Sequence, residues 1–244
     1  MAKYSSKDTV FLIDGYNVLG VTTQVDHAVE ALTEETTPFG AEWETHEYIG
    51  LKRTEFSQQG FFDDAASSVN DALSGKQGES RIVCFGIEGN TIGRKFTGFR
   101  GVMHSKYTRI GSRENLHRAN ADYLGNGVTE DGRIIHALTA RTADGDTEAT
   151  PVDNAAATAA GGSAYLQVSA LTLDGYTDLT VVVRESADGI AWNDLTTFTA
   201  VALAPGKERK AIVGNIKRYL AVSYEFTGIG TSPTATFFVG VVRD

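Results

Sequence analysis

The sequence predicts a mainly β protein, and three observations support this prediction. Short runs of β-branched and aromatic residues recur along the 244-residue chain, which contains 26 glycines for turns but only four prolines. Apolar residues make up 41% of the chain, which is enough for a packed core. Only one stretch, residues 64–74, has the spacing of an amphipathic helix. We therefore expect β-sandwich or barrel architecture, with one short helix covering an open side of a sheet.

Residues 64–74 carry the signals of a helix start and a helix end. Asp63 or Asp64 is a suitable N-cap, because a carboxylate there accepts hydrogen bonds from the first free backbone N–H groups. Gly75 follows where a left-handed C-cap belongs. The apolar positions that recur every four residues are Ala65, Val69 and Leu73. This stripe predicts that one side of the helix packs against a sheet.

A first unit, residues 1–141, is expected to form the β-sandwich or barrel that contains this helix. Its strands are expected at residues 10–13, between 47 and 60, and at 81–86, 97–107, 117–124 and 133–138. The last two strands are expected to pair as a hairpin, because glycine-rich turns lie between them. The polar residues 1–9 are expected to form an arm that becomes ordered only on assembly.

The clearest boundary is the stretch 142–162, which is rich in Ala, Thr, Asp and Gly and lacks large apolar residues. This composition predicts a linker. The remaining residues, 163–244, are expected to form a second β-sandwich of the jelly-roll type. Its six short strands are expected at residues 165–168, 179–183, 196–201, 209–213, 219–224 and 236–242.

The charge of the chain argues against nucleic-acid binding through the phosphates. The net charge is −9 and the pI about 5.1, and the sequence shows no Lys/Arg cluster of the kind that binds phosphates. An acidic surface suits a conduit that repels DNA and lets it slide. No apolar run approaches membrane-spanning length and no signal peptide begins the chain. We therefore expect no membrane insertion, and synthesis in a cytoplasm.

Much of the negative charge falls in residues 26–47, which contain no Lys or Arg. The seven acids of this stretch are Asp26, Glu30, Glu34, Glu35, Glu42, Glu44 and Glu47. Such a stretch is by default a solvated loop. A loop this long inside a compact domain usually has a task, however.

No combination of residues indicates catalysis, a cofactor or a metal site. The five histidines lack the spacing that zinc needs, and no P-loop, nucleophile elbow or dinucleotide motif occurs. The single cysteine, Cys84, lies in an apolar strand and is expected to be buried. One alternative stays open. The strand at 10–13 followed by Asp14 resembles the opening of PIN-like ribonucleases, in which an Asp holds a divalent cation, although the regular strand–helix alternation of that fold is missing.

Several short motifs in the first 140 residues or so resemble, in order and spacing, the tail tube (major tail) proteins of long, flexible-tailed bacteriophages. These motifs are residues 36–40 (TTPFG), 49–51 (IGL), 60–66 (GFFDDAA), 96–99 (FTGF) and 117–123 (HRANADY), followed by Gly125. The resemblance implies a structural protein of the virion tail, not an enzyme, and no cofactor. It implies six subunits per ring, rings that stack into a tube, and an inter-subunit β-barrel that lines the bore.

The same resemblance implies which partners the chain meets. They are further copies of the chain in homo-hexameric rings, the tape-measure, terminator and distal tail proteins, and genomic DNA as non-specifically accommodated cargo. In tail tube proteins, the region that matches residues 26–47 is a long loop or hairpin that packs against a neighbouring subunit or the next ring. We therefore expect Phe39 and Trp43 to be buried in such a contact.

Residues 186–192 (SADGIAW), with 218–222 (RYLAV) after them, resemble discoidin-type, galactose-binding-like jelly rolls. The Asp-Gly pair suits a tight turn, and Trp192 is expected to return to the sandwich as a core residue whose indole N–H needs one partner. In a tube, this second unit is expected to project outward as decoration. Two alternatives stay open. In the first, Trp192 is exposed and stacks on a sugar instead of packing in the core. In the second, the chain is a capsid decoration or host-surface protein that binds glycans through this second unit, instead of a tube subunit.

Overall fold

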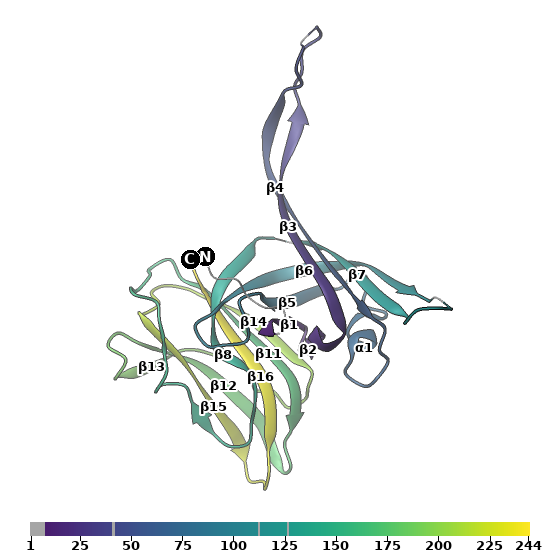
Figure 1. Cartoon of the computed structure of the whole chain (residues 1–244). Helices are drawn as coiled ribbons and strands as arrows, with labels where there is room; N and C mark the ends of the chain where they lie inside the picture. Colours follow the sequence, from purple (N-terminus) through teal and green to yellow (C-terminus); the bar gives the residue numbers. More distant parts are fainter. Residues whose placement is uncertain (1–7, 41, 112, 126) are drawn as a thin grey trace.

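The computed structural model of the chain describes residues 8–40, 42–111, 113–125 and 127–244. These residues form a nearly all-β structure with one short α-helix, which confirms the predicted fold class (Figure 1). Every pair of named strands in the described residues is antiparallel, and the strands make one sheet of eleven strands and one of five. The predicted N-terminal arm, except its last two residues, lies outside the described residues.

The first half of the chain builds a curled sheet. Its strands are β1 (Val10–Ile13), β2 (Tyr16–Asn17), β3 (Thr22–Glu35), β4 (His46–Phe61), β5 (Ser80–Gly86), β6 (Lys95–Ile110), β7 (Arg118–Gly125) and β8 (Thr129–Arg141). Seven of them lie side by side in the order β2-β1-β5-β6-β7-β4-β3, and β8 pairs with the first part of β6. The sheet curls until Phe11 of β1 and Phe56 of β4 meet with ring centroids 5.5 Å apart. Apolar side chains fill the barrel-like interior that results.

The predicted helix exists but is shorter than residues 64–74. It is α1 (Val69–Leu73), because the Asp63 carboxylate ties the preceding residues into a turn instead of capping a helix at that point. Asp63 accepts hydrogen bonds from the Ala65 N–H at 3.0 Å and the Ser68 hydroxyl at 2.7 Å. Val69 and Leu73 are fully buried against the curled sheet, as the apolar stripe predicted, whereas Ala65 is exposed.

The predicted hairpin between residues 117–124 and 133–138 is wrong, although both strands exist. β7 pairs with residues 102–110 of β6 and with β4. β8 pairs instead with residues 95–99 of β6 and with β16 (Thr234–Arg243). The physical reason is the length of β6, whose 16 residues accommodate β7 and β8 in succession along one edge.

The second half of the chain forms a β-sandwich with strands at five of the six predicted places, whereas the strand expected at residues 196–201 begins earlier and ends at Thr197. The strands are β11 (Gly162–Thr172), β12 (Tyr176–Ser186), β13 (Trp192–Thr197), β14 (Gly206–Ile212), β15 (Tyr219–Gly228) and β16. β14, β11 and β16 form one layer, while β13, β12 and β15 form the other. Apolar side chains from both layers make the core between them.

The two halves share one sheet. β16 pairs with β8 as well as with β11, so the eleven-stranded sheet continues from the barrel into the sandwich. Phe237 belongs to the sandwich core, whereas Phe238 belongs to a third core together with Phe96 and Tyr165. We call this third core the joint core. β16 therefore buries both of its faces. Its continuous apolar sequence at residues 237–242 is typical of a strand buried on both sides.

A polar cluster ties the end of β1 to the second half. The buried carboxylate of Asp14 pairs with the buried guanidinium of Arg81 and lies 2.5 Å from the ammonium of Lys207 in β14. The backbone N–H of Gly15 donates to the side-chain carbonyl of Gln167 in β11. A buried ion pair of this kind specifies one arrangement of its elements, since either charge alone would be costly to bury.

A second polar cluster joins β8 to the sandwich. Glu130 accepts hydrogen bonds from the hydroxyls of Ser163, at 2.6 Å, and Tyr165, and it pairs with Arg209 at 2.5 Å. Burial alone would raise the pKa of Glu130, but these hydrogen bonds outweigh burial and lower it. The carboxylate is therefore held in its charged form at the junction between the two halves.

The segment 142–162, expected to be a linker, packs against the sandwich. It contains β9 (Gly145–Asp146) and β10 (Val152–Asp153), which both pair with β15. Asp153 also pairs with Arg218 at 2.6 Å. The segment is therefore not a free linker, because its short strands and polar side chains bind to the sandwich. The division into two units at residues 141 and 163 stays a prediction.

Candidate functional site

One element leaves the body of the molecule. β3 and β4 form a hairpin whose outer part, residues 30–53, stands alone above the body; we call this part the arm (Figure 1). At about 3.3 Å per residue, β3 alone extends roughly 45 Å. The default interpretation of residues 26–47 as a solvated loop is therefore wrong, and the hairpin that the resemblance implies is present.

The tip of the arm exposes two aromatic side chains. Phe39 is fully exposed and Trp43 is 82% exposed. The tip is closed by a hydrogen bond from the Thr36 N–H to the Thr45 carbonyl at 2.8 Å, and by one from the Thr45 N–H to the Thr37 hydroxyl at 2.9 Å. Burying each ring in a contact would contribute about 1.5–3 kcal/mol. Burial of both rings against a neighbouring subunit stays a prediction.

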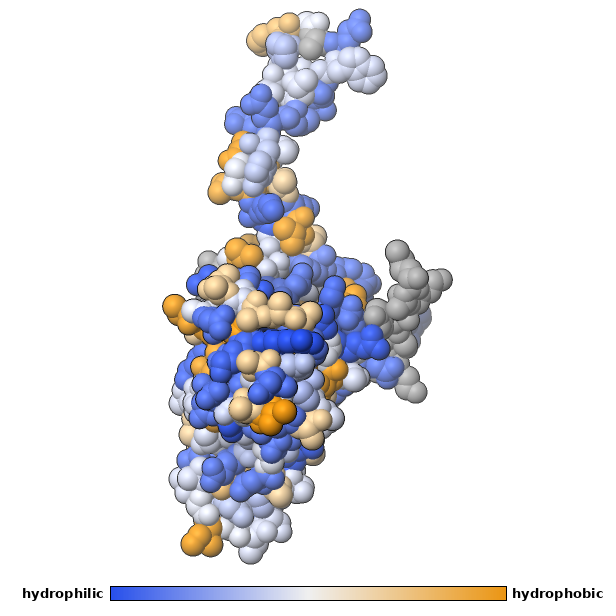
Figure 2. Space-filling view, turned by 90° about the vertical axis from the view of Figure 1, so that its left-hand side faces the viewer, coloured by the Kyte–Doolittle hydropathy of each residue, from blue (hydrophilic) through white to orange (hydrophobic). Residues whose placement is uncertain are grey.

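The arm has neither a covered face nor a paired outer edge. Tyr48, Ile49 and Leu51 are each about half exposed. In the described part of the chain, β3 pairs only with β4, and β4 pairs with β7 only from Glu55 onward. The outer N–H and C=O groups of the arm therefore have no strand partner. Figure 2 shows apolar side chains scattered among polar ones along the arm. An isolated two-stranded ribbon is at best marginally stable in water.

The hairpin is also the most acidic part of the chain. Residues 22–61 contain eight carboxylates and two cationic side chains, a formal charge of −6 out of the −9 of the whole chain. Arg53 pairs with Glu30 across the ribbon at 3.0 Å. Glu34 and Glu47, by contrast, lie directly opposite each other in the register. Like charges at opposite positions destabilise a strand pair, so the arm is electrostatically unfavourable by itself.

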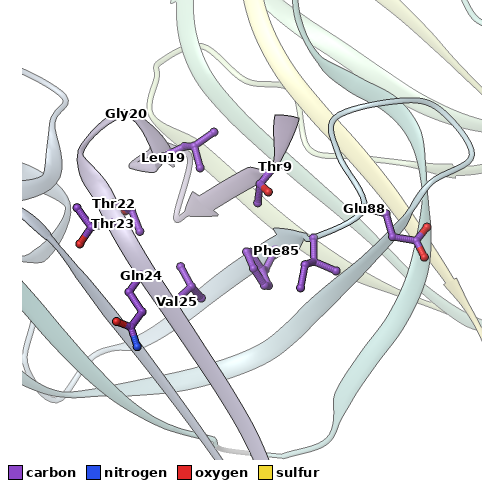
Figure 3. A pocket seen from close by; sticks show the side chains of 10 residues that line it. Thr9, Leu19, Gly20, Thr22, Thr23, Gln24, Val25, Phe85 and Glu88 are labelled. Atoms are coloured by element: carbon purple, nitrogen blue, oxygen red, sulfur yellow. The ribbon is translucent and has the colours of Figure 1, made fainter. Parts of the chain in front are cut away.

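A groove of about 780 Å³ opens at the base of the hairpin, between β3 and the end of β5 (Figure 3). It is lined by Thr9, Leu19, Gly20, Thr22, Thr23, Gln24, Val25, Phe85, Ile87 and Glu88. The groove lies where the curled sheet does not close, because β3 forms no ladder with β1 or β2 in the described residues. Its lining has one charged group, Glu88, and nothing that resembles a catalytic arrangement.

The carboxylate that the nuclease alternative needs is used structurally. Asp14 pairs with Arg81 and Lys207 and accepts a hydrogen bond from the Ile82 N–H at 2.8 Å. No group of three or more His, Cys, Asp or Glu side chains in the described residues is arranged to hold a metal ion. Among the same residues, no helix has the length and apolar content needed to cross a membrane.

Trp192 is not a core residue, so that prediction is wrong. It is only partly buried, because it begins β13, an edge strand, at the rim of the sandwich. The preceding turn is closed by Asp188, which accepts hydrogen bonds from the backbone N–H groups of Ile190 at 2.9 Å and Ala191 at 3.0 Å. The Asp-Gly turn is thus confirmed, and stacking of Trp192 on a sugar stays a prediction.

Sequence reasoning missed a cationic cluster at the end of a second hairpin. β6 and β7 are joined by residues 111–117, and residues 105–118, which we call the basic hairpin, contain four cationic side chains and one carboxylate. The four exposed cations are Lys106, Arg109, Arg113 and Arg118. Their close spacing in an otherwise acidic chain was the available signal. The net charge of −9 masks this signal, because acids outnumber bases in the chain as a whole.

Comparisons with known proteins give distant structural likenesses. No protein-family model matches the chain, and no curated protein matches it. A chain from the virion of the native gene transfer agent (GTA) particle is similar at 16% identity and a TM-score of 0.37, covering 52% of this chain and 97% of that one. A chain from the tail of the empty GTA particle, refined with C6 symmetry, is similar at 15% identity and a TM-score of 0.38, with the same coverage.

A third structure is the SPP1 Dit (gp 19.1) protein, described as a paradigm of the hub adsorption apparatus in phages that infect Gram-positive hosts. It is similar at 11% identity and a TM-score of 0.35, covering 96% of this chain and 98% of that one. Because all three TM-scores lie below 0.5, the function proposed below rests on the geometry and sequence of this chain.

Proposed function

We propose that the chain is a structural subunit of a bacteriophage tail tube, which works by assembling with copies of itself rather than by transforming a substrate. The arm is the observation that carries this proposal. It exposes both faces, both outer edges and two aromatic rings at its tip. Pairing across the ribbon is its main support within one chain, and a protein partner would supply the burial that its described residues lack.

The open sheet determines the type of assembly that fits. The arm and the surface that receives it are different parts of the chain, so copies can join in one direction, arm to receiving surface, and head-to-tail contacts of this kind close into a ring or continue as a helix. The motifs at residues 36–40 and 60–66, in and beside the hairpin, support a tail tube as the specific form. The proposal accordingly includes homo-hexameric rings that stack into a tube in the virion tail.

Other partners belong to the same proposal. Genomic DNA would pass through the bore without specific contacts, and the acidic balance of the chain suits such passage. The tape-measure, terminator and distal tail proteins would meet the tube at its inside and its ends. The second half of the chain would form the outer decoration. Because β16 pairs with β8, this decoration would move with the tube as one body.

Deleting the arm tests the proposal. Val29 and Thr54 lie directly opposite each other, so residues 30–53 can be replaced by an Asn-Gly turn between them. No described residue in this range is buried, so the variant should fold and unfold thermally like the wild type. Velocity sedimentation and negative-stain microscopy of the concentrated wild type should show rings or tubes, whereas the arm-less variant should stay monomeric.

The tip supplies a finer test with a matched control. Replacing Phe39 and Trp43 with serine should weaken assembly. Replacing Val213 and Ile229 with serine should not, although these residues are 95% and 93% exposed, because they lie on the sandwich. A wild-type chain that stays monomeric at every concentration, or an arm-less variant that assembles as readily as the wild type, would contradict the proposal.

A further inference from the structure

We infer that the arm of one copy docks on the basic hairpin of a second copy. The inference rests on the proposed self-assembly and names the surface that receives the arm. The arm lies in residues 22–61, which carry a formal charge of −6, whereas residues 105–118 carry +3. Opposite potentials on two exposed surfaces steer their encounter and fix their register.

The two hairpins cannot satisfy each other within one copy. β4 pairs with β7 along residues 55–61, which fixes both hairpins at their bases. Beyond that point the arm rises above the body while the ends of β6 and β7 extend to the side (Figure 1). The contact must therefore form between two copies, and a head-to-tail arrangement of such contacts builds the proposed ring or tube.

The cations of the basic hairpin are available to a partner. Lys106, Arg109 and Arg118 are exposed, and no carboxylate in the described part of the chain lies within ion-pair distance of them. Arg109 lies 5.8 Å from the centroid of the Phe62 ring, and Arg118 lies 5.7 Å from that of Phe61. Arg109 also donates a hydrogen bond to the Ser74 hydroxyl at 2.7 Å. These neutral partners orient the guanidinium groups but supply no negative charge to pair with them.

Apolar side chains accompany the charges on both surfaces. Ile110 and Leu116 of the basic hairpin are 44% and 72% exposed. On the arm, Tyr48, Ile49 and Leu51 are about half exposed. A contact between the two ribbons would bury apolar surface and pair opposite charges together. It would also offer strand partners to the free edges of the arm.

The arm itself points to a cationic partner. Glu34 and Glu47 lie directly opposite each other, and a cation from a second copy placed between them would turn this repulsion into two attractions. The groove at the base of the hairpin is the other candidate acceptor for the arm. Its lining contains one charged group, the carboxylate of Glu88, so it would repel an acidic ribbon.

Charge reversal in matched pairs tests this docking. The arm variant is Glu34→Lys with Glu47→Lys, which keeps two like charges opposite each other and so leaves the internal repulsion of the arm unchanged. The hairpin variant is Lys106→Glu with Arg113→Glu, which spares the two arginines on aromatic rings. Each variant alone should require about tenfold or more protein to assemble, measured by velocity sedimentation.

Mixing the two variants is the decisive step. In an equimolar mixture, the reversed arm of one variant meets the reversed hairpin of the other, while the remaining contacts are wild-type, so the mixture should assemble almost as readily as the wild type. A control, Lys95→Glu with Arg100→Glu, makes the same change in net charge at the other end of β6 and should assemble normally.

The outcomes separate this inference from the proposed function. A wild type that never assembles overturns the function. If the wild type assembles but the equimolar mixture of the two variants does not, the docking is overturned and the proposed function stands. The docking is also overturned if the control fails as badly as the hairpin variant. It is overturned too if the hairpin variant assembles normally, and a block by Ile87→Glu would then point to the groove as the receiving surface.

Discussion

Replacing Phe238 with alanine should destabilise the whole chain and not only its second half. Phe238 is fully buried in the joint core, where its ring centroid lies 5.5 Å from that of Phe96 at 77° between the ring planes. Truncating a buried phenylalanine to alanine costs about 3–5 kcal/mol, because apolar contacts are lost and a cavity remains. In a chain of this size, each kcal/mol lowers the melting temperature by about 2–4 °C, so a fall of about 6–20 °C is expected.

The neighbouring residue supplies the matched comparison. Phe237 is equally buried and lies in the same strand, but it belongs to the sandwich core instead of the joint core. Differential scanning calorimetry of the wild type should show one unfolding transition, since β16 pairs with β8 and both cores share this strand. Phe238→Ala and Phe237→Ala should each shift that single transition by a similar amount.

Two separate transitions in the wild type would refute this reasoning. So would a Phe238→Ala variant in which one transition moves and the other stays. Either result would mean that residues 1–141 and 163–244 fold independently and that the shared sheet couples them only weakly. The same coupling predicts that a chain cut after residue 141 is unstable, because it loses β16 and exposes the joint core.

Three further predictions concern single side chains. Burial above all lowers the pKa of His136 to about 4 from the ordinary value of 6.5. The free energy of unfolding should therefore be highest above pH 6.5 and fall by about 3 kcal/mol as the pH drops to 4, because only the unfolded chain takes up the proton. Urea unfolding should show this slope and lose it in His136→Gln; an unchanged slope would contradict the assignment. Asp14→Ala should cost about 3–5 kcal/mol, because the buried guanidinium of Arg81 loses its partner, and a variant as stable as the wild type in urea would contradict the structural role. In a Trp192→Phe background, the fluorescence of Trp43 should shift to shorter wavelength on assembly, and no shift would mean that the tip stays in water.

The strands were largely predictable from the sequence, because their signals are local. The alternation and apolar runs that define them depend on neighbouring residues, so β1, β5 and five of the six strands of the second half were placed correctly, while β13 was placed four residues too late. The helix was predicted too long, because the carboxylate of Asp63 suits both a cap and a turn. Only the contacts with Ala65 and Ser68 decide between these two roles.

The relation between the two halves was not predictable, because it depends on pairing between distant strands. Nothing near β16 indicates that it pairs with β8, about a hundred residues earlier in the chain. The apolar run at 237–242 held a partial signal, since a strand with one solvated face alternates instead. The segment 142–162 appeared to be a linker because its β9 and β10 are only two residues long.

The candidate site divides in the same way. Phe39 and Trp43 were identified through a resemblance, and the structure shows both to be exposed at the tip of the arm. The basic hairpin was missed because its charge of +3 is hidden in a chain whose net charge is −9. Its cations are close together in the sequence, but only the fold shows that they lie at the end of a hairpin, away from the acidic arm.

A cryo-electron microscopy reconstruction of the assembled wild-type protein tests the central claim most directly. The account predicts subunits in which residues 30–53 lie against a neighbouring copy, with Phe39 and Trp43 buried and the outer edges of the arm in contact with protein. An assembly whose arms project freely into solvent, with each curled sheet closed on itself, would contradict it.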